Sequence, residues 1–424
     1  YTTHPTNKII SNKVRTIVKS DDLTVWIGTD EGLNIIELSS KNISTYLNGQ
    51  ESSDIHTIIK DVTGNLWLGT YEKGINIFFE DSLHFRHYAN GNMSGYIDLL
   101  AETTDGKVWF NDADSGINYM GNTTSGNYIK ATEGKEIYHI EADNKNNLWI
   151  NTASNELFIY KVSTKETIKV KDWQKESLYD DDMRYPFQLF NNNLWFIDIN
   201  GNLTSYKIST NKFHRYDTEE NHRLKAFDID IKNNIIWITS TKNQLMSFDL
   251  SITPYGKNKF NYHNLQGVNN LDSIEIDNIK SSDSWVWLTS QQGVLLYNNI
   301  TKATTYFNEN NKLLNNSIQS VLLDNQDNAW FSTNRAISLI NPVTQQVKNF
   351  GKDLHLSNIN FLQNSALKTI NNEFFFGGSI GVHKFYPKKI VKITQILNPP
   401  ILTNLMIANE DILVSDHESD PNNP

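Results

Sequence analysis

The 424-residue sequence contains no cysteine. This absence excludes thiol nucleophiles, CxxC redox motifs and thiolate metal sites, but it says little about compartment because a chain of this size can rely on its core. The sequence also has no run of 18 apolar residues, so no segment of it is expected to span a membrane. The opening residues Tyr1–Pro5 lack the basic head and apolar stretch of a signal peptide, and we therefore expect a mature or excised piece.

Positive charge is scarce as well. The chain has 38 Lys and Arg against 48 Asp and Glu, which gives a formal net charge of −10 at pH 7. A nucleic-acid groove needs a basic surface, and anionic lipid repels an acidic one, so we expect contact with neither. The hydrophobic content of 38% is enough for a packed core and too high for a disordered chain.

What the sequence does have is a repeat built around one tryptophan. Its clearest copy is Leu-Trp-Leu-Gly-Thr at 66–70, and nine windows carry a version of it, the last with phenylalanine instead of tryptophan. The nine anchors are Trp26, Trp67, Trp109, Trp149, Trp195, Trp237, Trp287, Trp330 and Phe375. Successive anchors are 41, 42, 40, 46, 42, 50, 43 and 45 residues apart. A period of about 40–45 residues is typical of the blades of a β-propeller.

Each window reads as four short strands. In the second window these are 55–60, 66–70, 75–79 and 85–88, and the Gly, Asn and Asp residues between the first two suit a hairpin. No window shows a helical apolar period, so helical solenoids are excluded. The sequence therefore predicts an all-β fold, a β-propeller of four-stranded antiparallel blades. We expect the nine anchors to be structural residues buried between adjacent blades.

The phase of the repeat predicts how the ring closes. The last window has no convincing fourth strand before Pro399, and seven windows counted back from Phe375 reach Trp109. The preceding strip, 85–88, could supply the missing strand and remove an exposed sheet edge. We expect the last blades of an upstream propeller at 1–82, a seven-bladed ring at 83–392, and a linker with the start of another β domain at 393–424. A single eight- or nine-bladed ring is the alternative.

The candidate binding residues lie in loops expected at one face of the propeller. Long insertions occur at 171–185 and 253–259, and loops on a rigid scaffold tend to carry binding residues. Aromatic faces and charged groups hold sugars, and the ordinary alternative for each such residue is a solvated side chain. The candidates are Tyr71, Lys73, Asp112, Asp114, Tyr138, Trp173, Arg184, Tyr185, Arg223, Lys225 and Arg335.

The sequence offers no specific enzymatic arrangement. Its 11 histidines form no HExxH or HxH motif, and GxSxG, GxxxxGK and GxGxxG motifs are absent. Asp112 with Asp114, and the run Asp180–Asp182, could hold Ca²⁺ or act as a carboxylate pair, but such residues are expected in propeller turns. We therefore expect no catalytic residue, no metal site and no cofactor in this region.

The blade strips resemble a known family. Ile55–Ile75, Ser11–Leu33 and Ser317–Ile337 follow the pattern I-x-x-I-x-x-D-x-x-G-N-L-W-L-G-T-x-x-x-G-I closely and resemble the two-component regulator propeller repeat. That family forms the periplasmic sensor region of hybrid two-component system proteins of Bacteroides-type bacteria. There, an immunoglobulin-like triple-tyrosine domain follows the propellers, and Pro399–Thr403 resembles its entry.

The resemblance implies a function that periodicity does not show. It implies a periplasmic ligand-sensing domain that binds a glycan-derived oligosaccharide and passes the signal to a cytoplasmic histidine kinase, and so to transcription. The parent protein would be membrane-anchored and its sensor region a homodimer. The alternatives are a protein-interaction scaffold and a propeller lyase.

Overall fold

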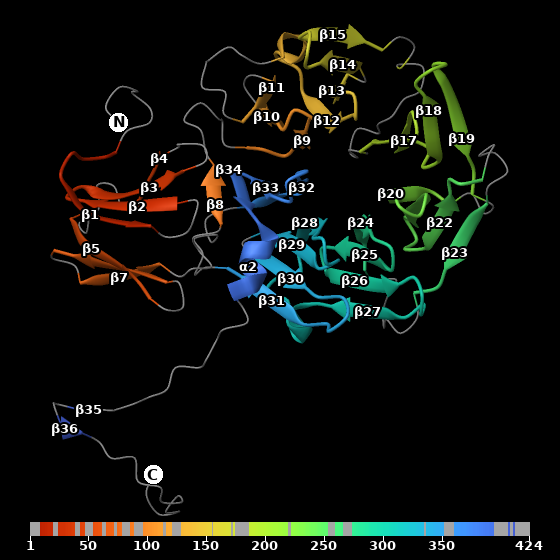
Figure 1. Ribbon diagram of the computed structural model, residues 1–424. Coiled ribbons are helices and arrows are strands. Elements are labelled where there is room, and N and C mark those ends of the chain that lie inside the picture. The colour runs from red at the N-terminus through yellow and green to blue at the C-terminus, as the bar shows by residue number, and fades with distance from the viewer. Residues whose placement is uncertain are drawn as a thin grey trace, which may run out of the picture.

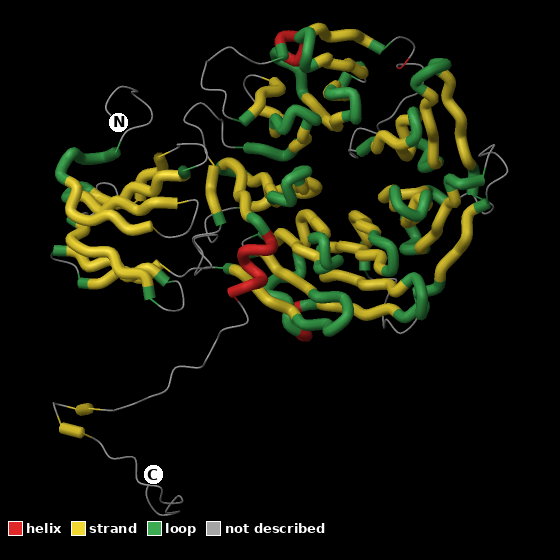
Figure 2. Tube along the Cα trace, in the orientation of Figure 1, coloured by secondary structure: helices red, strands yellow, loops and turns green. Residues whose placement is uncertain are grey.

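The computed structural model describes residues 9–19, 24–38, 43–46, 54–61, 65–71, 74–78, 85–88, 96–112, 116–120, 129–154, 156–170, 173, 186–218, 222–252, 259–265, 274–334, 336–351, 360–393, 406–407 and 410–411. Nearly all regular structure in these ranges is β, arranged in antiparallel sheets (Figures 1 and 2). The all-β propeller predicted from the repeat is confirmed.

Two sheets form a unit that stands apart from the ring and is drawn red at the left of Figure 1. Their shared core contains Trp26, Leu33, Ile55 and Leu68. The first sheet consists of β1 (Val14–Lys19), β2 (Thr24–Thr29), β3 (Gly32–Glu37) and β4 (Ile43–Tyr46), and the second of β5 (Ile55–Lys60), β6 (Leu66–Thr70) and β7 (Ile75–Phe78).

Seven further sheets follow one another around a circle in Figure 1. In the order of the chain, their strands and two 3-10 turns are β9 (Leu100–Glu102), β10 (Val108–Asp112) and β11 (Gly116–Tyr119); η1 (Lys130–Thr132); β12 (Ile137–Ala142), β13 (Asn147–Thr152), β14 (Leu157–Lys161) and β15 (Glu166–Lys169); β16 (Gln188–Phe190), β17 (Asn193–Ile197), β18 (Leu203–Lys207) and β19 (Lys212–Tyr216); β20 (Leu224–Asp230), β21 (Ile235–Ser240), β22 (Leu245–Asp249) and β23 (Phe260–His263); β24 (Ile276–Ser281), β25 (Trp285–Ser290), β26 (Gly293–Asn298) and β27 (Thr304–Phe307); η5 (Glu309–Asn311); β28 (Ile318–Leu323), β29 (Ala329–Thr333), β30 (Ile337–Ile340) and β31 (Val347–Phe350); and β32 (Phe361–Lys368), β33 (Phe374–Gly378) and β34 (Gly381–Phe385).

The last of these sheets takes its fourth strand from a segment almost 300 residues earlier in the chain. Strand β8 (Arg86–Tyr88) pairs with β34, with His87 opposite His383, and the sheet order is β32-β33-β34-β8. The strand that the phase of the repeat assigned to this place therefore occupies it. The domain boundaries at 82/83 and 392/393 stay predictions.

The first and last sheets of the circle are joined at their inner strands too. Ile97 N donates to Gly378 O at 3.0 Å, and Ser365 Oγ donates to Ile97 O at 2.9 Å. On the far side of the same seam, Ile370 N donates to a carboxylate oxygen of Glu102 at 2.6 Å. The circle is thus held together by its inner strands as well as by β8.

Asparagine supports many of the hairpin turns, as the composition predicts. Asn146, Asn211, Asn234 and Asn372 all adopt positive φ values of 54–63°. Asparagine tolerates this left-handed region better than most residues, which suits it to tight turns between short strands.

Eight of the nine anchors are buried, and the ninth corrects the prediction. Trp67 is 39% exposed, whereas Trp26, on the neighbouring sheet, is 2% exposed. Trp67 in β6 lies between Ile59 of β5 and Ile77 of β7, which are also exposed, because no further sheet among the described residues covers this side of the β5–β7 sheet.

One aspartate explains why the tryptophan lies at a fixed place after the hairpin turn. The two oxygens of Asp324 accept hydrogen bonds from Asn328 N at 3.0 Å and from the indole N–H of Trp330 at 3.1 Å. Asp143 and Asp61 make the equivalent indole bonds at 3.0 and 2.8 Å. The aspartate therefore fixes the turn and orients the indole of the following strand.

The segment assigned to the ring ends in a helix. The chain leaves β34 in α2 (Pro387–Ile393), which ends where the linker is expected to begin. Proline suits the first turn of a helix because its fixed φ is helical and no N–H is needed there. Beyond it, the described part of the C-terminal region consists of β35 (Met406–Ile407) and β36 (Glu410–Asp411), which pair with each other. The immunoglobulin-like domain stays a prediction.

Candidate functional site

Those predicted loop residues that the structure describes lie near one end of the sheets, which we call the upper rim. It is the end where the second strand of each sheet finishes, as at Thr152 and Ser240. Of the candidates, Lys73, Asp114, Arg184, Tyr185 and Arg335 lie outside the described residues. Asp112 is described as the last residue of β10, where its backbone pairs with that of Gly116.

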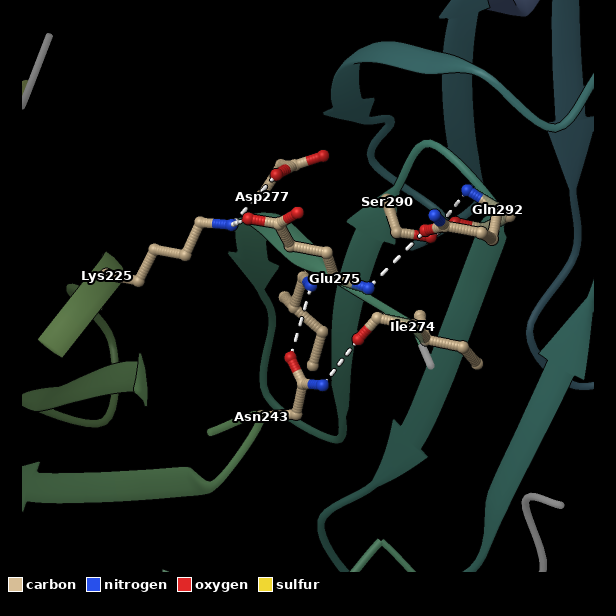
Figure 3. Close-up of polar contacts among 9 residues, drawn as sticks. Lys225, Asn243, Ile274, Glu275, Asp277, Ser290 and Gln292 are labelled. Carbon is tan, nitrogen blue, oxygen red and sulfur yellow. Dashed lines mark hydrogen bonds and ion pairs between the residues drawn. The ribbon is translucent and has the colours of Figure 1, made fainter. Parts of the chain in front are cut away.

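Lys225 links two neighbouring sheets at the upper rim (Figure 3). Its Nζ lies 2.7 Å from a carboxylate oxygen of Glu275 and 3.0 Å from one of Asp277. The Lys225 side chain is 12% exposed, while that of Glu275 is 74% exposed. The hydrogen bond from Lys225 holds the pKa of Glu275 below its usual range. The charge of this candidate residue is therefore already matched within the protein.

The backbone beside this ion pair is also held from the neighbouring sheet (Figure 3). The amide of Asn243 donates to Ile274 O and accepts from Ile276 N at 3.2 Å. Gln292 accepts from Glu275 N at 3.4 Å. These bonds fix the chain where it enters β24, so this part of the rim forms a seam between two sheets.

Arg223 occupies a similar place one sheet earlier. Its Nη2 donates to Ile199 O at 3.2 Å, and its side chain packs against Gly201. Gly201 has φ +81°, and a Cβ there would lie 2.2 Å from Cγ of Arg223. The structure thus brings Arg223 and Lys225 together at the start of β20, where Arg223 contacts the preceding sheet and Lys225 the following one.

The aromatic candidates are widely separated. Tyr71 is 70% exposed and stacks on His56, with ring centroids 5.2 Å apart, on the two-sheet unit outside the circle. Tyr138 is half-buried in β12. Trp173 is 1% exposed and packs edge-on against Phe196 and Tyr206. The expectation that the ring of Trp173 meets a ligand is therefore corrected: this ring fills the core.

The inner strands carry a polar set that sequence reasoning missed. Four residues face the anchor across the first hairpin of consecutive sheets, and we call them the inner ring: Glu141, Gln188, Asp228 and Lys280, opposite Trp149, Trp195, Trp237 and Trp287. In the other three sheets of the circle the same place holds Ala101, Leu322 and Leu367.

The inner ring joins each sheet to the next by the same kind of hydrogen bond. Glu141 accepts from Leu189 N at 3.0 Å, and Gln188 accepts from Ile229 N at 2.9 Å. Asp228 then accepts from Ser281 N at 2.8 Å. In each case the donor is the residue after the inner-ring position of the next sheet. The first strand of each sheet is an edge strand, and its N–H groups that point away from the sheet would otherwise have no backbone partner. The inner-ring side chains accept hydrogen bonds from these N–H groups.

Lys280 is the last residue of the inner ring and its one cationic member. Its Nζ lies 2.7 Å from Asp228 Oδ1, and its side chain is 39% exposed. It also opposes the raised pKa of Glu141, three sheets back, and adds to the lowering of the pKa of Lys368 that burial causes, two sheets ahead. A charge that acts on strands three sheets back and two sheets ahead lies toward the middle of the circle.

Two titratable groups on β12 are kept uncharged by burial. Burial raises the pKa of Glu141 to about 8, against the opposing effects of Leu189 N–H and Lys280. Burial lowers the pKa of His139 to about 4, against a hydrogen bond with the backbone of Phe187. Glu141 Oε2 and His139 Nε2 are sealed from solvent and have no hydrogen-bond partner among the described residues. At neutral pH both groups are therefore neutral.

The spacing of the inner ring explains why the sequence did not reveal it. The four residues stand eight, seven, nine and seven positions before their anchors, because the intervening turns differ in length. A fixed-offset search misses such a set. The signal lies in the strand register, which becomes visible only once the hairpin pairs are known.

Metal and membrane features can be judged for the described ranges only. Within them, no three or more His, Asp or Glu side chains gather in a way that could hold a metal ion. No helix in that part of the chain is long and apolar enough to cross a membrane.

Comparison with known proteins gives one curated relative and several solved structures. No protein-family model matches the chain. Histidine kinase P4 of Formosa agariphila is 24% identical over 279 residues, which cover 62% of this chain and 20% of that protein. The extracellular domain of the hybrid two-component system BT3049 of B. thetaiotaomicron superposes with a TM-score of 0.59 at 19% identity, covering 96% of this chain and 62% of that one.

Two further solved structures share less. The extracellular domain of the one-component system BT4673 of B. thetaiotaomicron has a TM-score of 0.50 at 17% identity, covering 94% of this chain and 55% of that one. A virginiamycin B lyase of Staphylococcus aureus has a TM-score of 0.51 at 11% identity, covering 71% of this chain and 98% of the lyase.

The comparisons bear on the fold and on the resemblance. At these identities the solved structures show the propeller fold. The resemblance read from the repeat is confirmed in that structural neighbours are extracellular domains of Bacteroides two-component systems and a curated relative is a histidine kinase. The chain spans about a fifth of the length of that curated relative and less than two thirds of the BT3049 domain.

Proposed function

We propose that the chain is an extracytoplasmic ligand-sensing region of a hybrid two-component receptor, without enzymatic activity of its own. The observation that carries this proposal is the 279-residue match to a histidine kinase, which falls on a chain with a propeller fold. The likeness to the extracellular domains of the two-component system BT3049 and the one-component system BT4673 supports it, because they cover 96% and 94% of the chain, whereas the lyase covers 71%.

The ligand we propose is a glycan-derived oligosaccharide. Carboxyl, amide and ammonium groups stand on the inner strands of four consecutive sheets, and such groups bind sugar hydroxyls by direct hydrogen bonds. Binding would be passed on to a cytoplasmic histidine kinase, with the sensor region acting as a homodimer in the periplasm. Sedimentation of the chain with and without sugar tests the dimer.

Calorimetric titration tests the binding step. A panel of oligosaccharides from plant and host polysaccharides is titrated into the chain, and we expect saturable binding of one structural series. Silence across the whole panel contradicts the proposal. In parallel, mass spectrometry of the same sugars after overnight incubation tests for lyase or hydrolase products, and their appearance would identify the chain as an enzyme instead.

A further inference from the structure

Strands β24 and β32 meet across the middle of the circle, although the sheet that begins with β28 lies between theirs. The side-chain amide of Asn278 on β24 donates to Asn364 Oδ1 on β32 at 2.6 Å. Asn278 Oδ1 also accepts from Ile279 N at 2.7 Å. The contact between the two amides is solvent-exposed, so one N–H of Asn278, the NH₂ group of Asn364 and a second lone pair on each oxygen stay within reach of other molecules.

A bulge in β32 makes this contact possible. The register with β33 passes from Phe361–Gly378 to Ala366–Phe376, so the four residues 362–365 on β32 stand opposite one residue, Gly377, on its partner. Asn364 lies inside the bulge with φ 58°, and Gln363 beside it is exposed. Bulges re-aim side chains and are frequent next to functional sites. Here the bulge brings the amide of Asn364 to Asn278 on β24, and the exposed amide of Gln363 follows the same bulge.

Charged groups accompany the amide pair. Lys280 lies two residues after Asn278, so the two side chains leave the same face of β24. Lys368 ends β32, and its Nζ donates to Leu323 O at 3.0 Å and Asn325 Oδ1 at 2.9 Å. An ammonium group has three donors, so each lysine keeps at least one N–H beyond the bonds to these protein partners.

The charges around this centre are balanced inside the protein. Asp228 pairs with Lys280 at 2.7 Å, Asp324 and Asp327 oppose the lowered pKa of Lys368, and Glu141 keeps its proton at neutral pH. An anionic ligand would be repelled by these carboxylates, and a cationic ligand by the two lysines. An uncharged ligand with many hydroxyls avoids both repulsions and can form hydrogen bonds with the donors and acceptors that remain.

We propose that Asn278, Asn364, Gln363 and Lys280 form a binding site for an uncharged saccharide at the centre of the circle. This inference deepens the proposed function and rests on it: it moves the site from the upper-rim loops to the inner strands and excludes uronate and sulfated sugars as the preferred ligands.

The test uses the full 424-residue chain and two exposed amides. Asn278→Ala and Asn364→Ala are titrated with neutral gluco-, manno-, galacto- and xylo-oligosaccharides and with their uronate and sulfated counterparts. We expect the neutral series to bind, and each variant to weaken it by about tenfold, as loss of a hydrogen bond to the ligand allows. Asn349→Ala, in the outer strand β31, is the matched control and should bind as the wild type does.

Side-chain amide signals give a second readout that does not depend on affinity. In ¹⁵N-labelled protein, the NH₂ resonances that Asn278→Ala and Asn364→Ala remove should shift when the neutral sugar is added. Circular dichroism shows whether each variant folds.

The outcomes separate the two proposals. Neutral sugar that binds all variants equally and leaves the two amide signals unmoved overturns this site but keeps the sensor. Binding of only uronate or sulfated sugars overturns the ligand class and also keeps the sensor. Binding of no saccharide overturns both.

Discussion

Glu141 gives a prediction about stability that can be worked out from the structure. Replacing it by glutamine keeps the carbonyl that accepts from Leu189 N but removes the ionisable group. The folded chain holds the Glu141 proton up to a pKa of about 8, whereas the unfolded chain loses it near the ordinary value of 4.5. Between these two pH values the folded state binds more protons, so the free energy of unfolding falls as pH rises.

The size of the effect follows from linkage. Each unit of pKa difference corresponds to about 1.4 kcal/mol, so at pH 7 the wild type should have lost about 3 kcal/mol relative to pH 4.5, and at pH 9 about 4 kcal/mol. Glu141→Gln should lack this loss. The variant and the wild type should therefore unfold at similar urea concentrations near pH 4.5, and the variant should be the more stable one at pH 7 and above.

Urea unfolding followed by tryptophan fluorescence at pH 4.5, 7 and 9 measures this difference. Glu166→Gln is the matched control, because Glu166 is an exposed glutamate on β15 that pairs with Lys161 at 3.0 Å, and exposed pairs contribute little. Its stability should track that of the wild type within about 0.5 kcal/mol at every pH. Parallel pH profiles of wild type and Glu141→Gln would refute the reasoning, since the buried carboxyl would then be ionised in the folded protein.

Three further predictions concern single residues. Between pH 6.5 and pH 4 the wild type should lose about 3 kcal/mol of its free energy of unfolding, because the unfolded histidine takes up a proton before the folded one does. His139→Gln should lack this loss, and urea unfolding at pH 4.5 and 7 checks it. Asp324→Ala should lower the free energy of unfolding by about 3 kcal/mol, because its hydrogen bonds to the turn and to the indole of Trp330 are lost. Asp61→Ala should lower it by less, because its partner Trp67 is exposed. Equal losses in urea unfolding would contradict the role of burial. Gly201→Ala should cost about 2 kcal/mol, from its positive φ and the clash with Arg223, and an unchanged melting temperature would contradict it.

The sequence predicted the architecture because propeller blades bury the same residue at the same place. The tryptophan period, the turn asparagines and the aspartate six residues before Trp330 all report local geometry, which repeats from sheet to sheet. The role of β8 was predictable for a related reason: a window without a fourth strand leaves an edge, and 85–88 was the strip whose phase fitted it.

The candidate site was much harder to predict. Lys225 looked like an exposed loop cation, but its partners Glu275 and Asp277 stand about fifty residues later, on another sheet. Trp173 lies in an insertion, yet it fills the core, because a large apolar ring gains more from burial than from exposure in a loop. The contact of Asn278 with Asn364 depends on a bulge and on the curvature of the whole circle, neither of which leaves a periodic mark.

The exchange of β8 has a consequence for how movement could travel through the molecule. The chain enters the circle through β8 and, after one complete circuit, leaves it through β34 into α2, and these two strands are hydrogen-bonded neighbours. The incoming and outgoing segments are therefore side by side rather than at opposite ends. A force on the two-sheet unit before β8 would therefore be passed to the strand that leads into α2 directly, across one ladder of backbone hydrogen bonds, without going around the circle.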